Sequence, residues 1–144
     1  MTVAQILNSK GRSVIIATPD DTLKNIADTL AKKRIGAVVI IGSEGDIVGI
    51  VSERDVVRAI SALGARALDK PASEIMTTSV MTCDPRDSEA ELMGLMTEHR
   101  IRHLPVVDDG KLDGMISIGD VVKFRIEAIE HEAEEMKVYI ASSG

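Results

Sequence analysis

Aromatic side chains are almost absent from this chain of 144 residues, which contains one Phe, one Tyr and no Trp. Proteins that bind single-stranded nucleic acids usually stack the bases on aromatic rings. Acidic residues also outnumber basic ones, 23 to 17, so the net charge is −6 and no broad basic face is expected to neutralise phosphates. Both deficits argue against nucleic acid as a partner, and the shortage of rings predicts a core of aliphatic side chains.

Cysteine, histidine and long apolar runs are scarce as well. The single cysteine, Cys83, excludes an internal disulfide, and we expect it to be a buried strand residue. His99, His103 and His131 have no cysteine near them that would complete a set of metal ligands, so no metal site is expected. No apolar run approaches the roughly 18 residues of a membrane span, and residues 1–10 do not resemble a signal peptide. We therefore expect no membrane association and a cytoplasmic location.

What the sequence does contain is an internal repeat. Residues 14–57 align with residues 80–122, at an offset of 66 residues before a turn and 65 after it. The matched pairs include Pro19 with Pro85, Ile26 with Leu92, Gly49 with Gly114, Ser52 with Ser117, and Asp55 with Asp120. A unit of about 45 residues is too small to bury a core alone. The two copies are therefore expected to pack together about a pseudo-two-fold axis.

Each copy changes its hydrophobic periodicity in the same order. In the first copy the pattern predicts a strand over 13–17, a helix that Gly36 ends, strands over 37–41 and 47–51, and a helix from Ser52. In the second copy, Ser88 and Glu91 have the spacing of a capping box, and residues 106–112 have the pattern of a hairpin turn. The sequence thus predicts an α/β (α+β) fold of two β-α-β-β-α repeats.

The chain ends in a third, helical part. The last helix is predicted to continue to about Ile140, with apolar residues on one side and five glutamates between Glu127 and Glu135 on the other. This length exceeds that of its counterpart in the first copy, which indicates an interaction arm. We divide the chain into a first repeat with a helical lead-in (1–70), a second repeat (71–125) and a helical extension (126–144).

Several of these features together resemble cystathionine-β-synthase (CBS) domains. They are the β-α-β-β-α order, the Pro-Asp-x-Thr turn at 19–22, the segment 99–108, and the Gly-h-h-Ser-x-x-Asp stretches (h, hydrophobic) at 49–55 and 114–120. The resemblance covers about residues 1–125, and a tandem pair of this kind is called a Bateman module. It implies a homodimeric, non-catalytic sensor of energy or redox state that binds an adenosine nucleotide, with AMP and NAD/NADH as the leading candidates and ADP, ATP and S-adenosylmethionine as others.

The resemblance also implies which residues contact the nucleotide. Ser52 and Ser117 match the hydroxyl on the phosphate side, and Asp55 and Asp120 match the carboxylate that binds both ribose hydroxyls. The first cleft is expected to contain Ser52, Arg54, Asp55, Ser79, Val80, Arg102 and His103. The second is expected to contain Ser117, Asp120, Ser13, Val14, Gly36 and Ala37, with cations from Lys10 and Arg12. Because Arg54, Arg102 and His103 gather in the first cleft, we expect it to be the better phosphate site.

Simpler interpretations of the same residues stay open. Ser52 with Asp55, and Ser117 with Asp120, have the spacing of capping boxes, which need no ligand. No nucleophile and base recur at a defined spacing, so neither an enzyme nor a catalytic cofactor is expected. The alternative to a nucleotide sensor is a ligand-free module that dimerises and docks on an unidentified protein.

Overall fold

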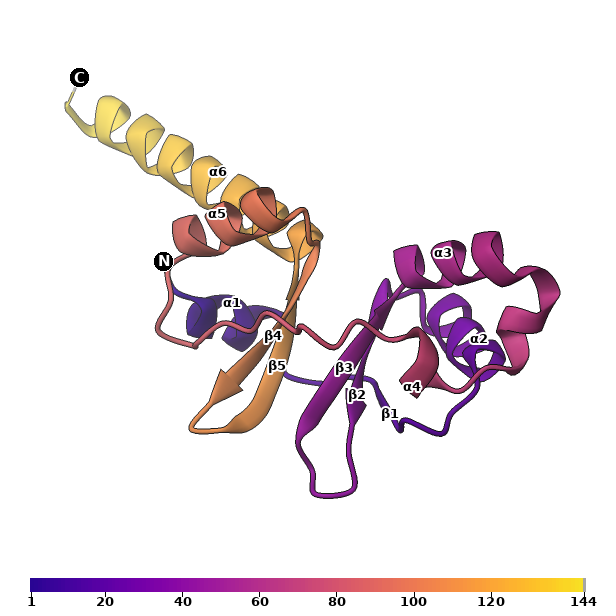
Figure 1. Cartoon of the computed structure of the whole chain (residues 1–144). Coiled ribbons are helices and arrows are strands. Elements are labelled where there is room, and N and C mark those ends of the chain that lie inside the picture. The colour runs from indigo at the N-terminus through magenta and orange to yellow at the C-terminus, as the bar shows by residue number, and fades with distance from the viewer. Residues whose placement is uncertain (144) are drawn as a thin grey trace.

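The computed structural model describes residues 1–143 and shows two repeat units side by side, with a long helix projecting from one of them (Figure 1). The helices are α1 (Val3–Lys10), α2 (Leu23–Lys33), α3 (Glu53–Leu63), α4 (Ala72–Ile75), α5 (Glu89–His99) and α6 (Ile118–Ser143), with a 3₁₀ helix at Gly64–Asp69. The strands are β1 (Ile16–Ala17), β2 (Ala37–Ile41), β3 (Ile47–Ser52), β4 (His103–Asp108) and β5 (Lys111–Ser117). This arrangement confirms the predicted fold class.

The first repeat contains a three-stranded sheet in the order β1-β2-β3. Strand β2 pairs antiparallel with β3 and parallel with β1. The predicted strand over 13–17 is shorter than expected, since only Ile16 and Ala17 pair with Val39 and Ile40. The helices α2 and α3 bury apolar residues against this sheet, and Leu23, Ile26, Ile40 and Val51 lie in its core.

In the second repeat, the strand equivalent to β1 is reduced to one parallel bridge between Cys83 and Val106. The Cys83 amide donates to the Pro105 carbonyl at 3.0 Å, and the Cys83 carbonyl accepts from Val107 at 2.9 Å. The neighbouring ladder bonds would need amide hydrogens from Pro85 and Pro105, which proline lacks. In the first repeat Val39 stands where the second has Pro105, and its amide donates to the Ile15 carbonyl at 3.2 Å. Cys83 is buried as predicted, with 4% of its surface exposed, but lies in a bridge and not in a regular strand.

The first helix of the first repeat ends earlier than predicted. Gly36 was expected to end α2, but Arg34 is the C-cap, in the left-handed conformation with φ of 55°, and Arg100 ends α5 in the same way with φ of 53°. The amide of Arg34 donates to the Leu30 carbonyl, which satisfies one of the free carbonyls of the last turn. Ser88 does cap α5, accepting from the Glu91 amide at 3.1 Å.

The short helices that precede each repeat pack on the other repeat. Val3, Ile6 and Leu7 of α1 lie in the core of the second repeat, whereas Ala72 of α4 lies in the core of the first. Matching glycines leave room for this exchange: a Cβ on Gly114 would lie 2.7 Å from Leu7 Cδ2, and one on Gly49 would collide with Met76. Each core therefore contains a helix that precedes the other repeat in the sequence. The division of the chain at residues 70 and 125 stays a prediction.

Helix α6 begins within the second repeat and then leaves it. Val121 is fully buried and Phe124 packs on the same core, but the helix continues well beyond the body of the protein (Figure 1). It reaches Ser143, slightly past the predicted end near Ile140. Within residues 1–143, no helix has the length and apolar character needed to cross a membrane.

Candidate functional site

A cleft of about 780 Å³ lies between the two repeats. Its walls come from the β3–α3 junction of the first repeat, the segment 77–81, the turn between α5 and β4, and the start of α6. This volume is within the range of about 300–1,000 Å³ that is typical of small-molecule sites. Both repeats contribute polar groups to it, so the cleft exists only in the paired arrangement.

All the residues predicted for the first cleft line this cavity: Ser52, Arg54, Asp55, Ser79, Val80, Arg102 and His103. The residues predicted for a second cleft are divided. Gly36 and Ser117 line the same cavity, whereas Lys10, Ser13, Val14, Ala37 and Asp120 are not among the described residues that line it. Their role as nucleotide contacts stays a prediction.

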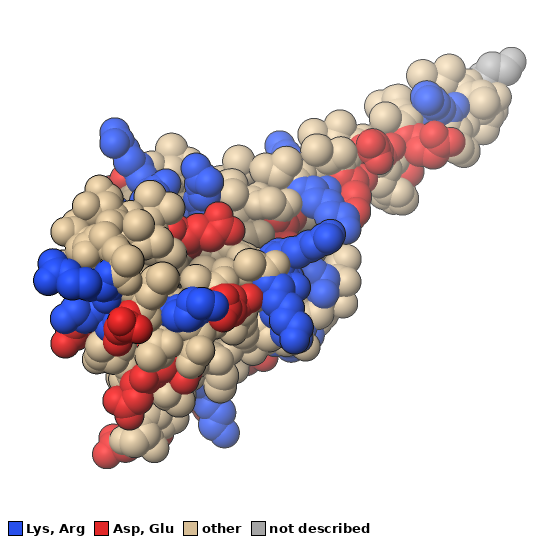
Figure 2. Space-filling model, turned by 90° about the vertical axis from the view of Figure 1, so that its right-hand side faces the viewer, with Lys and Arg blue, Asp and Glu red and all other residues tan. Residues whose placement is uncertain are grey.

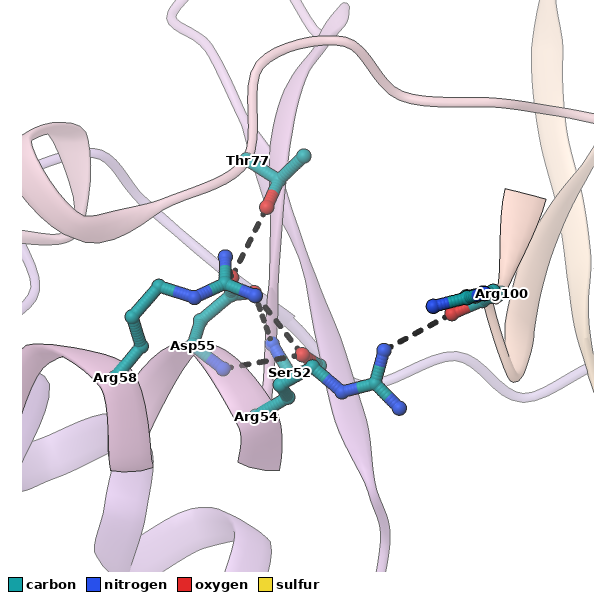
Figure 3. A network of polar contacts seen from close by, with 6 residues as sticks. All are labelled: Ser52, Arg54, Asp55, Arg58, Thr77 and Arg100. Atoms are coloured by element: carbon teal, nitrogen blue, oxygen red, sulfur yellow. Dashed lines mark hydrogen bonds and ion pairs between the residues drawn. The ribbon is translucent and has the colours of Figure 1, made fainter.

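Asp55 is the most strongly held polar residue of the cleft, with 7% of its surface exposed. Its Oδ2 accepts from the Ser52 amide at 2.8 Å, and the Asp55 amide donates to Ser52 Oγ at 3.3 Å (Figure 3). This is the capping box of α3. The other oxygen, Oδ1, accepts from Thr77 Oγ1 at 3.0 Å, so the segment after α4 also holds the carboxylate by a hydrogen bond, from the opposite side. The geometry fixes Asp55 in one orientation, with its carboxylate bordering the cleft.

Four arginines line the cavity. Arg54 spans it, since Nη1 donates to the Arg100 carbonyl at 3.0 Å and so links α3 to the turn before β4. Arg58 lies one turn after Asp55, and its exposed guanidinium is 3.9 Å from Asp55 Oδ1 (Figure 3). Arg102 completes the group. Together with the N-terminus of α3, these guanidinium groups make the cleft suited to a phosphate.

His103 lies in the cleft close to the first repeat. A Cβ on Gly36 would lie only 2.7 Å from His103 Cε1, so a glycine at this position lets the imidazole approach the β2 end. Burial lowers the pKa of His103 below its ordinary value of 6.5, although the charges of Glu53 and Asp120 act in the opposite direction. The neutral form of His103 is therefore favoured, so we expect this side chain to offer a hydrogen-bonding group to the cleft, and its part in a positive phosphate site stays a prediction.

This lowered pKa predicts a pH dependence of stability. The unfolded chain binds a proton on His103 more readily than the folded chain. Protonation of His103 therefore leaves the free energy of unfolding unchanged above the ordinary pKa and lowers it as the pH falls below that value. We expect the free energy of unfolding, measured in urea, to decrease from pH 7.5 to pH 5.5 less steeply in His103→Gln than in the wild type. The control His131→Gln, at an exposed position of α6 outside the cleft, should not reproduce the flatter slope of His103→Gln. Equal slopes for wild type and His103→Gln would contradict the assignment.

The matching residues of the second repeat have a different partner. Asp120 Oδ2 accepts from the Ser117 amide at 2.9 Å, and the Asp120 amide donates to Ser117 Oγ at 3.1 Å, again as a capping box. Lys10 Nζ donates to the same Oδ2 at 2.5 Å and to the Met115 carbonyl at 2.7 Å. Burial acts to raise the pKa of Asp120, but the bonds from Lys10 and Ser117 outweigh it and leave the pKa below its usual value. Lys10 thus neutralises Asp120, whereas the sequence suggested it as a cation for the ligand.

Sequence reasoning missed Thr77, Arg58 and Arg100 in this cleft. Arg58 had a usable signal, because it follows Asp55 by one helical turn and so lies on the same face of α3. Arg100 had a weaker sequence signal, because it belongs to the run of basic residues before β4. Thr77 had none, since its contact with Asp55 depends on where α4 packs.

The sequence profile of the CBS domain matches residues 3–62 and again residues 72–127. The chain belongs to the CBS domain family. Among curated proteins, the mitochondrial CBS domain-containing protein CBSX3 of Arabidopsis thaliana is 33% identical over 147 aligned positions, which cover 96% of this chain and 71% of that protein. The two matched segments coincide with the two repeats, so the repeats are a pair of CBS domains.

Solved structures show the same pairing. A putative signal-transduction protein with CBS domains from Burkholderia ambifaria is 45% identical, with a TM-score of 0.84 over 88% of this chain and 95% of that one. A CBS domain protein from Pyrobaculum aerophilum, complexed with AMP, is 31% identical with a TM-score of 0.74, over 83% of this chain and 89% of that one. The CBS domain pair of protein MJ0100, in complex with 5′-methylthioadenosine and S-adenosyl-L-methionine, is 25% identical with a TM-score of 0.79, over 89% of this chain and 98% of that one.

Proposed function

We propose that this CBS pair is a non-catalytic regulatory module that binds an adenosine nucleotide in the cleft between its repeats. The observation that carries the proposal is Asp55, a nearly buried carboxylate fixed by Ser52 and Thr77 at the edge of a cavity that four arginines line. A purely structural cap needs neither the cavity nor the arginines. Two solved relatives with the same fold hold adenosine compounds, which supports this ligand class.

In the proposed complex, each part of the ligand meets a group of suited chemistry. Asp55 accepts hydrogen bonds from the ribose hydroxyls, and the phosphate lies near the N-terminus of α3 and the guanidinium groups of Arg54 and Arg102. The adenine lies against aliphatic side chains such as Val80 and Ile101, which suits a cleft whose described lining contains no Phe, Tyr or Trp. Ser79, His103 and Ser117 provide polar contacts at the border.

The site around Asp120 is proposed to bind more weakly. A ribose diol there must compete with Lys10 for the carboxylate, whereas at Asp55 it displaces the hydroxyl of Thr77 and meets only a longer ion pair, of 3.9 Å, with the exposed Arg58. A hydrogen bond between charged groups is stronger than one from a neutral hydroxyl, so the exchange costs more at Asp120. Ser13, Val14 and Ala37 remain the proposed base contacts of that weaker site.

The identity of the nucleotide is tested by a thermal-shift series with AMP, ADP, ATP, NAD, NADH, S-adenosylmethionine and 5′-methylthioadenosine. A ligand at about one hundred times its dissociation constant stabilises the folded state by roughly 2.7 kcal/mol, which raises the melting temperature by several degrees. We expect AMP or another adenosine compound to do so, and guanosine monophosphate, which has the same ribose and phosphate but a different base, to give a much smaller shift. No shift with any adenosine compound would overturn the proposal and favour the ligand-free interaction module.

Signalling requires further proposals. We propose that the protein acts as a homodimer and passes the state of the cleft, and through it the energy or redox state, to a protein target in the cytoplasm. The apolar side chains left exposed on α6 support an interaction of this kind, because large apolar patches on a folded protein usually mark contacts.

A further inference from the structure

The projecting part of α6 carries a regular apolar stripe. Its members recur at alternating intervals of four and three residues, the spacing of the a and d positions of a coiled coil. They are Val122, Ile126, Ile129, Ala133, Met136 and Ile140, which we name the α6 seam. With Ile126, Ala133 and Ile140 at a, the residues Val122, Ile129 and Met136 fall at d.

The α6 seam does not face the body of its own chain. The residues of α6 that pack on the second repeat, Ile118, Val121 and Phe124, are centred on a face about 100° around the helix from the seam. The large seam residues are exposed to between 45% and 62%. Apolar side chains therefore continue along one side of this helix. Figure 2 shows that the helix extends away from the body of the protein.

The charged residues beside the α6 seam distinguish between possible partners. At the flanking positions, Arg125 and Glu132 occupy g, and Lys123, Glu130 and Lys137 occupy e. In a parallel two-stranded coiled coil, a g residue of one helix faces the next e residue of the other. Arg125 then faces Glu130 of the second copy, and Glu132 faces Lys137 of the second copy, so every such pair has opposite charges. Nη1 of Arg125 also lies 3.7 Å from Glu89 of its own chain. The Arg125 side chain is nevertheless 63% exposed, so its other guanidinium nitrogens can donate to Glu130 of the second copy.

An antiparallel arrangement gives the opposite result. There e residues face e residues and g residues face g residues. With the seams fully overlapping, Glu130 meets Glu130, Glu132 meets Glu132, and Lys123 meets Lys137, all of like charge. An acidic foreign helix would leave half of these charges unmatched, and an apolar one would leave all of them unmatched. The seam is therefore complementary to a parallel copy of itself.

We propose that the α6 helices of two copies of this protein associate through the α6 seam as a parallel, in-register, two-stranded coiled coil. This rests on the homodimer proposed above and specifies its contact, but it does not depend on nucleotide binding. The first turns of α6 are anchored in the folded repeat, which supplies the helix nucleus that a coiled coil of this modest length would lack in isolation.

Cysteine cross-linking of the full chain tests the register. Ala133→Cys places a thiol at an a position, where it meets its own equivalent in a parallel dimer, and mild oxidation should link most of the protein as a disulfide dimer. The matched control is Val138→Cys, on the far side of the same helix and 62% exposed, which should stay unlinked. The native Cys83 does not interfere, because burial raises its pKa to about 12 and keeps it an unreactive thiol. Equal linking of both variants would overturn the proposal.

Charge exchange tests the direction of the helices by analytical ultracentrifugation. Lys137→Glu sets two Glu–Glu contacts in a parallel dimer and should raise its dissociation constant roughly three- to thirtyfold, while Glu132→Lys with Lys137→Glu should restore it. In an antiparallel dimer Lys137→Glu would instead meet Lys123 and tighten association. Tightening, a monomer at all concentrations, or a mass of three chains would each overturn the proposal. Thermal shifts with AMP on the same variants show separately whether nucleotide binding persists.

Discussion

Replacing Asp55 by asparagine should lower the affinity for the adenosine nucleotide about ten- to a hundredfold while leaving the ligand-free protein folded. Asparagine keeps an oxygen that can accept from the Ser52 amide, so the cap of α3 is largely preserved. It loses the negative charge that would hold the ribose hydroxyls, and a hydrogen bond to a charged group contributes about 1.5–3 kcal/mol. The two roles of Asp55 therefore separate, because the cap affects stability and the ribose contact affects binding. Isothermal titration calorimetry measures the affinity, and urea unfolding measures the stability.

The matched control is Asp120→Asn, the same change in the second repeat. Since Lys10 already neutralises Asp120, this variant should lose stability more than affinity at the stronger site. A second control uses 2′-deoxyadenosine monophosphate, which should bind the wild type more weakly than AMP but lose little further affinity in Asp55→Asn. If both asparagine variants bind AMP as the wild type does, only the capping role of these aspartates remains.

Removing the side chain of Leu7 should destabilise the second repeat, although Leu7 lies outside it in the sequence. Leu7 is fully buried in the second core, and replacing such a leucine by alanine typically costs about 2–5 kcal/mol of the free energy of unfolding. The adjacent change, Gly114→Ala, adds a Cβ only 2.7 Å from Leu7 Cδ2 and should cost about 1–3 kcal/mol by overpacking. Urea unfolding of both variants measures these losses.

The double variant decides whether the two residues share one space. In Leu7→Ala the new methyl group of Gly114→Ala enters the cavity, so the second change should cost almost nothing or restore stability. We expect the double variant to be at least about 1 kcal/mol more stable than additivity predicts. Asn8→Ala, on the exposed side of α1, should leave stability nearly unchanged. Strictly additive losses would show that α1 does not pack where the structure has it.

The sequence by itself determined the elements and their order, because these depend on local signals. Periodicity identified α2, β2, β3 and α6, and the hydroxyl residues before α3 and α5 marked where these helices begin. The repeated Ser-x-x-Asp spacing placed Ser52 and Asp55 together, since residues three apart on a helix start must meet. Gly36 was misjudged because the backbone of Arg34 adopts a left-handed turn that composition does not reveal.

Only the tertiary structure decided which segment covers which core and which group meets each carboxylate. An apolar face on α1 signals that the helix is buried, but not that the second repeat buries it. The contact of Lys10 with Asp120 spans 110 residues, and that of Thr77 with Asp55 spans 22. These partners follow from the exchange of α1 and α4 between the repeats, which places a cation beside one aspartate and a hydroxyl beside the other. Two sites that are nearly equivalent in sequence thus become chemically different once the chain is folded.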